Sequence, residues 1–523
     1  RRLLAESRHP LARLHALWSL EGLEALSEGD LLLALRDEPS GMREHAVRLA
    51  ERRLTASHEL VKQVMALAAD EAVRVRFQVA FSLGELLAAP AGAEQPNSHL
   101  RGDALAALAG IARRDATDAW VRTAVLSSVS EAAPALLADL LADRQFVAGA
   151  EAARLLQDLA AIIGARHRAA ELADALRAIA AVDEQGDADA QAGLLIGLAA
   201  GLRRAGALKS GGLLASDLIA ADSPTARLIA RQTERAQALL ADGEAPLDRR
   251  LQAIDLLAIS GYDQASPSLA GLLSPREPQE VQRQAVRALS GYSDPAVAVL
   301  LLRNYAALTP GVRGEIIIAL LARRERLAAL LDALEDRRLN AADIPAARRK
   351  LLLEHADPNL RRRAAALLSQ DAPTPRRQVL DDYRSAVSLP GDRQRGQRVF
   401  QRECQTCHRL GESGHDVGPS LLTIKHRTRQ EVLTHVLDPN REVAPNFQEY
   451  VVALDDGRVI AGIIADETAT SVTLRRAERI DETILRRNID EMSSTGHSLM
   501  PEGLEKKINH QEMADLLEYL LGK

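Results

Sequence analysis

Two cysteines and a histidine stand together near the C-terminal end of the chain, in the run Cys404-Gln405-Thr406-Cys407-His408. The 523 residues contain no other cysteine, which excludes a disulfide scaffold for a chain of this size. Two thiols three positions apart can add to the two vinyl groups of a haem, because one helical turn brings them under adjacent vinyls. The next residue then directs its imidazole toward the iron. The pattern therefore predicts one covalently bound haem c with His408 as an iron ligand.

Two other kinds of site could use the same residues. A zinc site needs four ligands, so in the absence of further cysteines it would need a distant histidine besides His408. A redox dithiol of the thioredoxin type follows a strand in a βαβ unit. No such unit is visible here, since the segment 395–403 before the motif has the pattern of a helix, with Gly396 and Phe400 on one face. Both sites stay open as alternatives to haem.

The second axial position of an electron-transfer haem is usually filled by methionine or histidine. Met500 is followed by Pro501, which stiffens a loop and prevents the continuation of a helix, so this side chain can be held toward the iron. His497 is the alternative ligand. Met492 and Met513 are more typical of core packing, the second on a terminal helix. Met500 is therefore the predicted second ligand.

The C-terminal part resembles class I cytochromes c in the order and spacing of Gly396, Phe400, Cys404, Cys407, His408, Gly418-Pro419 and Met500-Pro501. The resemblance implies that the Pro419 carbonyl accepts a hydrogen bond from the ring of His408 and fixes its orientation. It also implies that Gly418 and Met500 belong to the cofactor-binding residues. A terminal helix should cross the helix before the motif, where Gly396 permits close approach.

Two helices of this part carry capping signals. Thr428 and Glu431 form a capping box for a helix at about 429–437. Asn509 and Glu512 do the same for the terminal helix.

Between His408 and Met500 lie 91 residues, more than a minimal cytochrome needs. The excess falls at about 447–492, where alternating apolar and polar residues predict a small antiparallel β insertion. Its expected strands are 450–454, 459–464, 471–474 and 483–486, with a hairpin turn at Asp455-Asp456-Gly457.

The first 370 residues have the pattern of helices throughout, with apolar residues recurring at three and four positions. Apolar residues make up 47% of the chain and aromatic residues only 2%, as in helices packed on helices through small side chains. An aliphatic residue followed by arginine recurs at the start of helices, at Met42-Arg43, Val73-Arg74, Val121-Arg122, Val312-Arg313 and Leu360-Arg361. The first spacings are 31 and 48 residues, and near the end Gln282-Arg283 precedes Val312-Arg313 by 30 and Leu360-Arg361 follows by 48. Such spacings predict stacked helix pairs in an α-solenoid, and the run Asp-Pro-Asn-Leu-Arg-Arg at 357–362 resembles HEAT repeats. An irregular helical bundle is the alternative.

The predicted fold class is therefore mostly α. We expect a HEAT-like α-solenoid over 1–370, a linker over 371–391 and an all-α cytochrome c domain over 392–523 with its β insertion. The linker is marked by Pro373, Pro375, Pro390 and Gly391.

A narrower resemblance includes the haem motif, the Asp-Gly-Arg turn at 456–458, and the segments 498–504 and 516–520. Over about 390–523 they resemble the haem-binding domain of planctomycete and verrucomicrobial proteins. Members of that family often carry HEAT-like repeats before this domain, and many carry a β-propeller of the sugar-dehydrogenase type further upstream. The resemblance implies electron transfer from an oxidation performed by a dehydrogenase domain outside this chain, with redox donor and acceptor proteins as partners.

Charge and hydropathy argue against two other classes of protein, nucleic-acid-binding proteins and membrane-spanning proteins. With 66 basic and 72 acidic residues the net charge is −6, which gives no nucleic-acid footprint. The sequence contains no run of about 18 apolar residues, so it predicts no membrane span. The chain starts at Arg1-Arg2 with no signal peptide, so we interpret it as a segment of a longer protein. Because covalent haem attachment occurs outside the cytoplasm in bacteria, the motif predicts a periplasmic or otherwise extracytoplasmic location.

Three functions follow from these observations. The first is an electron-carrier module, not itself an enzyme, with the repeats as a scaffold or a protein-binding surface. The second is a peroxidase-like haem enzyme with an open distal site. The third is a repeat scaffold with a structural metal site.

Overall fold

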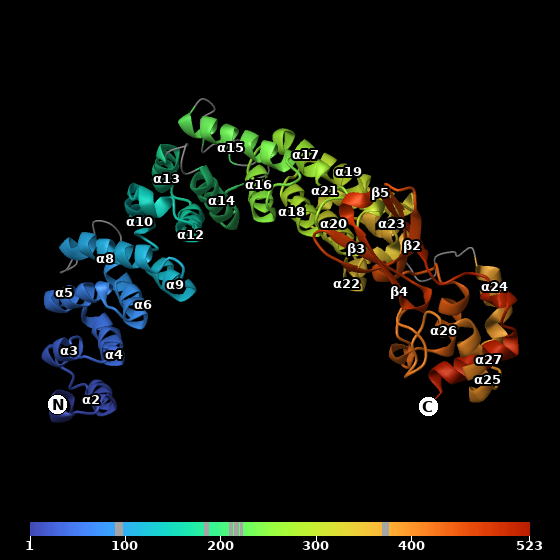
Figure 1. Ribbon diagram of the computed structural model, residues 1–523, viewed down its shortest axis with the longest axis horizontal. Helices are drawn as coiled ribbons and strands as arrows, with labels where there is room; N and C mark the ends of the chain where they lie inside the picture. Colours follow the sequence, from blue (N-terminus) through green and yellow to red (C-terminus); the bar gives the residue numbers. More distant parts are fainter. Residues whose placement is uncertain are drawn as a thin grey trace. The chain divides into compact units, whose positions relative to one another are not determined.

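The computed structural model describes residues 1–88, 98–182, 188–208, 213, 219, 223–368 and 376–522 (Figure 1). The chain forms two compact units. The first comprises Arg1–Ala238 with Ile259–Gly261, and the second comprises Leu239–Ala258 and the chain from Tyr262 onward. Within the described residues, no helix combines the length and the hydropathy that a membrane crossing requires.

The first unit consists of helices in two rows. Its α-helices are α1 (Arg2–Glu6), α2 (Pro10–Gly22), α3 (Glu28–Ala34), α4 (Ser40–Ala50), α5 (His58–Ala66), α6 (Val73–Ser82), α7 (Gly84–Leu87), α8 (Arg101–Arg114), α9 (Ala119–Ser128), α10 (Ala133–Ala142), α11 (Arg144–Val147), α12 (Ala152–Arg166), α13 (Ala169–Ala181), α14 (Ala188–Arg204) and α15 (Pro224–Ala241), with 3-10 turns η1 (Glu51–Arg53), η2 (Leu67–Ala69) and η3 (Ser98–Leu100). One row runs α2, α4, α6, α9, α12, α14, and the other runs α1, α3, α5, α8, α10, α13, each helix touching the next in its row. This stacking of helix pairs confirms the predicted α-solenoid of HEAT-like repeats.

A recurring arginine ties each repeat to the next. Arg13, Arg43 and Arg76 are each the fourth residue of their helix, and each donates to the backbone carbonyl six residues earlier. Each also pairs with an aspartate of the following loop, at 2.7 Å for Asp37, 2.6 Å for Asp70 and 2.6 Å for Asp115. The predicted phrase Val73-Arg74 therefore lies two residues too early in the sequence. Arg76 makes these contacts, whereas Arg74 pairs with Glu44 on the surface. We call this series of arginine–aspartate pairs the arginine ladder. It explains why an arginine is needed once per repeat.

The second unit begins with further helix pairs. Its repeat helices are α16 (Leu247–Leu257), α17 (Tyr262–Gly271), α18 (Gln279–Ser290), α19 (Ala296–Arg303), α20 (Pro310–Leu321), α21 (Arg324–Glu335), α22 (Ala346–Leu353) and α23 (Pro358–Leu368), with 3-10 turns η4 (Tyr305–Ala307) and η5 (Ala341–Asp343). Contacts run from α16 to α18 to α20, and from α19 to α21 to α23. The two-row arrangement of the first unit is thus repeated here.

A five-stranded antiparallel sheet follows, in the order β4-β3-β2-β1-β5. Its strands are β1 (Gln448–Leu454), β2 (Val459–Glu467), β3 (Ser471–Arg476), β4 (Ile480–Leu485) and β5 (Ile489–Ser498), with 3-10 turns η9 (Ala477–Arg479) and η10 (Arg486–Asn488). The β insertion is confirmed, and four of its strands were expected. The prediction missed β5, which pairs with β1 in the register Val452↔Met492 and leads the chain back toward the C-terminal helices.

The remaining helices of the second unit form an apolar core of their own. They are α24 (Arg377–Asp382), α25 (Arg393–Glu403), α26 (Arg429–Leu437) and α27 (His510–Leu521), with 3-10 turns η6 (Tyr383–Val387), η7 (Leu421–Ile424), η8 (Pro445–Phe447) and η11 (Leu504–Lys506). Helices α25 and α27 pack closely, and a Cβ added to Gly396 would lie 2.0 Å from the Asp515 carbonyl oxygen. Phe400 and Tyr519 meet beside this crossing with ring centroids 5.7 Å apart. Glycine is therefore required at 396.

Part of the predicted linker 371–391 packs on this core. Pro373 and Pro375 lie outside the described residues, but α24 and η6 fall within the linker range. The Tyr383 hydroxyl donates to the backbone carbonyls of Glu505 and Ile508, at 2.9 and 2.7 Å. The boundaries at 370 and 391 stay predictions, because a division into compact units does not locate the end of a fold type.

A buried polar network joins the sheet to the repeats. Arg313, the fourth residue of α20, is 4% exposed and pairs with Asp343 at 2.7 Å. It also donates to the Gln448 side-chain oxygen at 2.6 Å, and Gln448 donates to Asp343 at 3.0 Å. The Tyr450 hydroxyl donates to the Leu308 carbonyl at 2.7 Å. In Figure 1 the sheet accordingly lies beside the repeat helices of its own unit.

The close crossing of α25 and α27 gives a testable prediction. Gly396→Ala should lower the free energy of unfolding by about 3 kcal/mol, because its Cβ meets backbone that cannot move without separating the helices. Gly314→Ala, in α20, should raise it by about 0.5–1 kcal/mol, because its Cβ meets nothing within 4 Å. Thermal unfolding followed by circular dichroism measures both. Equal effects of the two substitutions would contradict the crossing.

Candidate haem site

The cysteine-histidine motif begins where helix α25 ends. Asp392 caps this helix by accepting a hydrogen bond from the Arg395 N–H, and the helix stops one residue before Cys404. The chain then makes one more turn, in which the N–H groups of Cys407 and His408 donate to the Cys404 carbonyl at 3.2 and 2.9 Å. This turn gathers the two thiols and the imidazole in one compact loop.

The His408 ring is held from one side by two neighbouring residues. Its Nδ1 lies 2.9 Å from the Pro419 carbonyl oxygen, and since a carbonyl only accepts, Nδ1 carries the hydrogen. Gly418 lies against the ring so closely that an added Cβ would be 2.5 Å from Cε1. Burial lowers the pKa of His408 below its ordinary value, which favours the neutral ring. The lone pair of a metal ligand is then left on Nε2.

The loop after the motif folds back over it. The Cys407 carbonyl accepts hydrogen bonds from the N–H groups of Val417 and Gly418, at 3.0 and 2.7 Å. Gly414 has φ +92°, and a Cβ at this position would lie 2.0 Å from the His408 carbonyl oxygen. Gly418 and Pro419 therefore reach the ring because a glycine upstream allows the chain to turn tightly beneath it.

The two cysteines are free thiols and both are half-buried. Cys404 packs at the margin of the apolar core that contains Phe400 and Leu516, and burial raises the pKa of its thiol to about 12. Two free thiols and a neutral imidazole beside an apolar wall are the groups that a covalent haem requires, so the residues present fit it. Among the described residues, no three His, Cys, Asp or Glu side chains come together in a metal-binding group.

The β insertion also touches the haem motif. The Glu478 N–H, in the turn between β3 and β4, donates to the Thr406 carbonyl at 2.9 Å. Arg475 donates to the Asp416 carbonyl at 3.3 Å. Glu478 and Arg479 both have left-handed backbone, with φ of +62° and +60°, a conformation that costs non-glycine residues of order 1 kcal/mol each. The sequence of the motif could not predict this contact, because the contact forms only when the sheet is folded.

Two comparisons bear on this site. The sequence profile of the cytochrome c family matches residues 393–522. A cytochrome c-553-like protein of Synechocystis is 36% identical to this chain over 75 residues, which cover 13% of this chain and 70% of that protein. This chain belongs to the cytochrome c family. Its cytochrome c domain therefore implies covalent haem and haem-mediated electron transfer with redox partners.

Solved structures were also similar to this chain over long stretches. The crystal structure of Kap121p has a TM-score of 0.37 and 12% identity, covering 76% of this chain and 47% of that one. An engineered protein has a TM-score of 0.28 and 16% identity, covering 69% of this chain and 91% of that one. This chain thus spans about half the length of Kap121p.

The predicted second ligand of the cytochrome c domain, Met500, follows β5 in a pinned loop. Asn440 accepts a hydrogen bond from the Ser498 N–H at 2.8 Å and donates to the Glu502 carboxylate at 2.7 Å. The Met500 N–H donates to the Ser498 hydroxyl at 3.1 Å. Sequence reasoning missed Asn440, because nothing in the run Asp438-Pro439-Asn440 signals a partner 58 positions away.

The other candidates for the second ligand lie elsewhere in the domain. Met492 is 1% exposed in the core of the sheet, and Met513 is fully buried on α27. His497 is exposed on β5. Met500 is half-buried and packs at the margin of the same apolar core as Cys404.

The glycine under the motif gives the second prediction. Gly414→Ala should lower the free energy of unfolding by about 3 kcal/mol, because left-handed backbone and a clash with the His408 carbonyl add together. Gly411→Ala is the matched control, with φ +64° and nothing within 4 Å of its Cβ, and should cost only about 1 kcal/mol. Urea unfolding measures the difference, and equal losses would contradict the tight turn beneath His408.

Proposed function

We propose that this chain carries single electrons through one haem c that is bound by Cys404 and Cys407 and ligated by His408 and Met500. The observation that carries the proposal is the contact between His408 Nδ1 and the Pro419 carbonyl, at 2.9 Å. It fixes both the tautomer and the direction of the ring, so that Nε2 is the nitrogen available to iron. The cofactor supplies reversible one-electron redox chemistry when bound.

The residues around His408 act as positioning groups in this proposal. The Pro419 carbonyl accepts a hydrogen bond from the imidazole N–H of His408. Gly418 has no side chain and so leaves room for the ring to lie against the backbone. Cys404 and Cys407 provide the sulfur atoms of two thioether bonds. These bonds attach the cofactor to the loop at the end of α25, so it stays bound through repeated oxidation and reduction.

Support for Met500 comes from its surroundings. Its thioether is half-buried at the edge of the apolar core, and its loop is fixed at both ends by the Asn440 side chain. Methionine is a soft ligand that suits haem iron in electron carriers. His408 and Met500 would together hold the iron and leave no position open for substrate, so the domain would transfer electrons and would not bind a reactant.

The wider assignment extends this proposal to the rest of the protein. We propose that the C-terminal part is the haem-binding domain of planctomycete or verrucomicrobial type, receiving electrons from a dehydrogenase domain outside this chain. The HEAT-like repeats then serve as the scaffold that carries the haem domain. Covalent attachment of haem supports an extracytoplasmic location for such a protein.

Replacement of Met500 tests the ligand assignment. Met500→Ala should convert a low-spin, carbon monoxide-insensitive haem into one that binds carbon monoxide when reduced, because the sixth position opens. Met492→Leu is the matched control, since it replaces a methionine buried in the sheet with a side chain of similar volume. Optical spectra before and after addition of carbon monoxide provide the measurement. Insensitivity of both variants would remove Met500 as a ligand while leaving the haem itself in place.

A further inference from the structure

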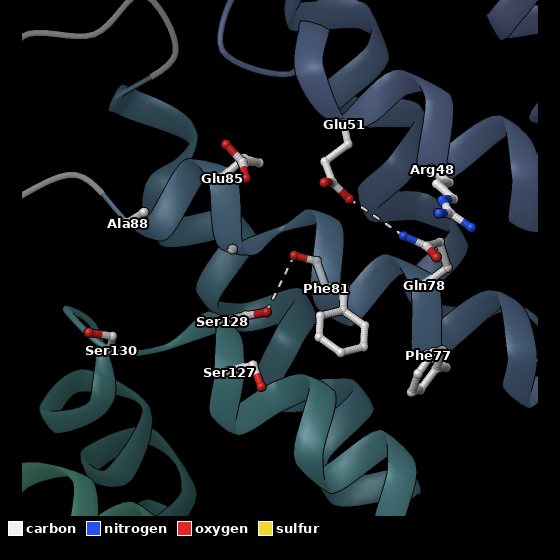
Figure 2. Close-up of a pocket in the computed structure, with 11 residues that line it drawn as sticks. Arg48, Glu51, Phe77, Gln78, Phe81, Glu85, Ala88, Ser127, Ser128 and Ser130 are labelled. Atoms are coloured by element: carbon white, nitrogen blue, oxygen red, sulfur yellow. Dashed lines mark hydrogen bonds between the residues drawn. The ribbon is translucent and has the colours of Figure 1, made fainter.

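A hollow of about 490 Å³ lies in the first unit, within the usual range for ligand and peptide sites. Figure 2 shows its walls, which come from α4, η1, α6, α7 and α9. Three of these, α4, α6 and α9, are consecutive members of one row of the solenoid. The hollow is therefore a groove across neighbouring repeats, as an extended partner segment needs.

One wall of the hollow is aromatic. Phe77 and Phe81, one turn apart on α6, contact each other edge to face with centroids 5.1 Å apart. Phe81 is 37% exposed, although the whole chain has only five phenylalanines with which to build its cores. Phe77 is half-buried, so the pair presents one exposed ring and the edge of another to the hollow, an apolar surface that a partner side chain could cover.

The lining also carries two carboxylates, Glu51 on η1 and Glu85 on α7. Glu51 accepts hydrogen bonds from the Ser82 hydroxyl at 2.8 Å and the Gln78 amide at 3.5 Å, so its position is fixed. Among the described residues, no arginine or lysine lies within ion-pair distance of Glu51 or of Glu85. The ladder aspartates of the same repeats are all paired with arginine. Within the described part of the chain, these two carboxylates thus lack the arginine partner that the aspartates of the same repeats have.

Among the described residues that line the hollow, Arg48 is the single cation. Its guanidinium lies 6.0 Å from the centroid of the Trp18 ring and so belongs to the rim nearest α2. With Glu51 and Glu85 against Arg48, the described lining residues have a net charge of −1. The chemistry of the hollow therefore favours a cationic group flanked by an apolar one.

We infer that this hollow binds an extended segment of a partner protein that presents a lysine or arginine next to an apolar side chain. The cationic group meets Glu51 and Glu85, and the apolar side chain lies on Phe77 and Phe81. Charge complementarity selects this occupant, because an acidic segment would be repelled and a small cation would leave the aromatic wall uncovered. The inference concerns the repeats alone and does not depend on the proposed electron transfer.

Fluorescence anisotropy of a labelled peptide tests this inference on the full chain. The probe is a short glycine-serine peptide that contains one lysine beside one leucine. We expect saturable binding that weakens with added salt, since the pair of opposite charges is solvent-accessible. Peptides with glutamate in place of lysine, or serine in place of leucine, should bind at least about fivefold more weakly.

Three variants assign the binding to the hollow. The double variant Glu51→Gln/Glu85→Gln should lose at least about fivefold in affinity, while the amide oxygen at position 51 can still accept the hydrogen bonds from Ser82 and Gln78. Phe81→Ala should lose affinity by a similar factor, and Arg48→Gln should gain affinity because a repulsion is removed. The control Glu59→Gln/Asp103→Asn removes the same charge outside the hollow, from α5 and α8, and should leave binding unchanged.

Each outcome decides the question. Binding that follows the expected order supports the site. Absence of peptide binding, equal binding of the lysine and glutamate peptides, or equal losses in the hollow and control variants would overturn it. A gain for the glutamate peptide that Arg48→Gln abolishes would assign the hollow to an acidic partner instead. Circular dichroism confirms that each variant is folded, and the haem spectrum reports on the electron-transfer proposal separately.

Discussion

The hydrogen bond between the His408 ring and the Pro419 carbonyl is the constraint on which the C-terminal part depends. An imidazole next to two cysteines could rotate, ionise or pair with a carboxylate. Here the carbonyl fixes the hydrogen on Nδ1, and burial lowers the pKa of the ring. For Pro419 to reach this position, the loop must turn at Gly414 and lie against the ring at Gly418. The local backbone is therefore arranged around a single side chain.

The β insertion connects this loop to the repeats of the same unit. Its β3–β4 turn donates to Thr406 in the motif, while β1 reaches the buried Arg313–Asp343 pair. Burial raises the pKa of Tyr450, so its hydroxyl stays protonated and donates to the Leu308 carbonyl. A buried ion pair of this kind contributes little net stability compared with an apolar contact, but removal of one partner would leave an uncompensated buried charge. The β insertion thus attaches the loop that contains the cysteine-histidine motif to the repeat helices of the same unit.

Local signals in the sequence were enough to predict many of the helices and strands of the C-terminal part. The capping boxes at Thr428–Glu431 and Asn509–Glu512 form as expected, and the alternating strands fold into a sheet. The strand β5 was missed because Ile489–Ser498 is largely polar and becomes a strand only by pairing with β1. Contacts such as Asn440 with Ser498, or Glu478 with Thr406, could not be predicted, since they join residues that no local pattern relates. The repeat arginine was found, but its register at Arg76 depends on where helix α6 begins.

The proposed attachment of one covalent haem at Cys404, Cys407 and His408 is tested most directly by the pyridine haemochrome assay. Protein matured with haem should give one haem per chain that resists extraction by acidic acetone and has the spectrum of a haem with two thioether bonds. The variant Cys404→Ser should shift that spectrum to a single thioether bond. Haem that is extracted completely, or a chain that contains zinc and no haem, would contradict the account.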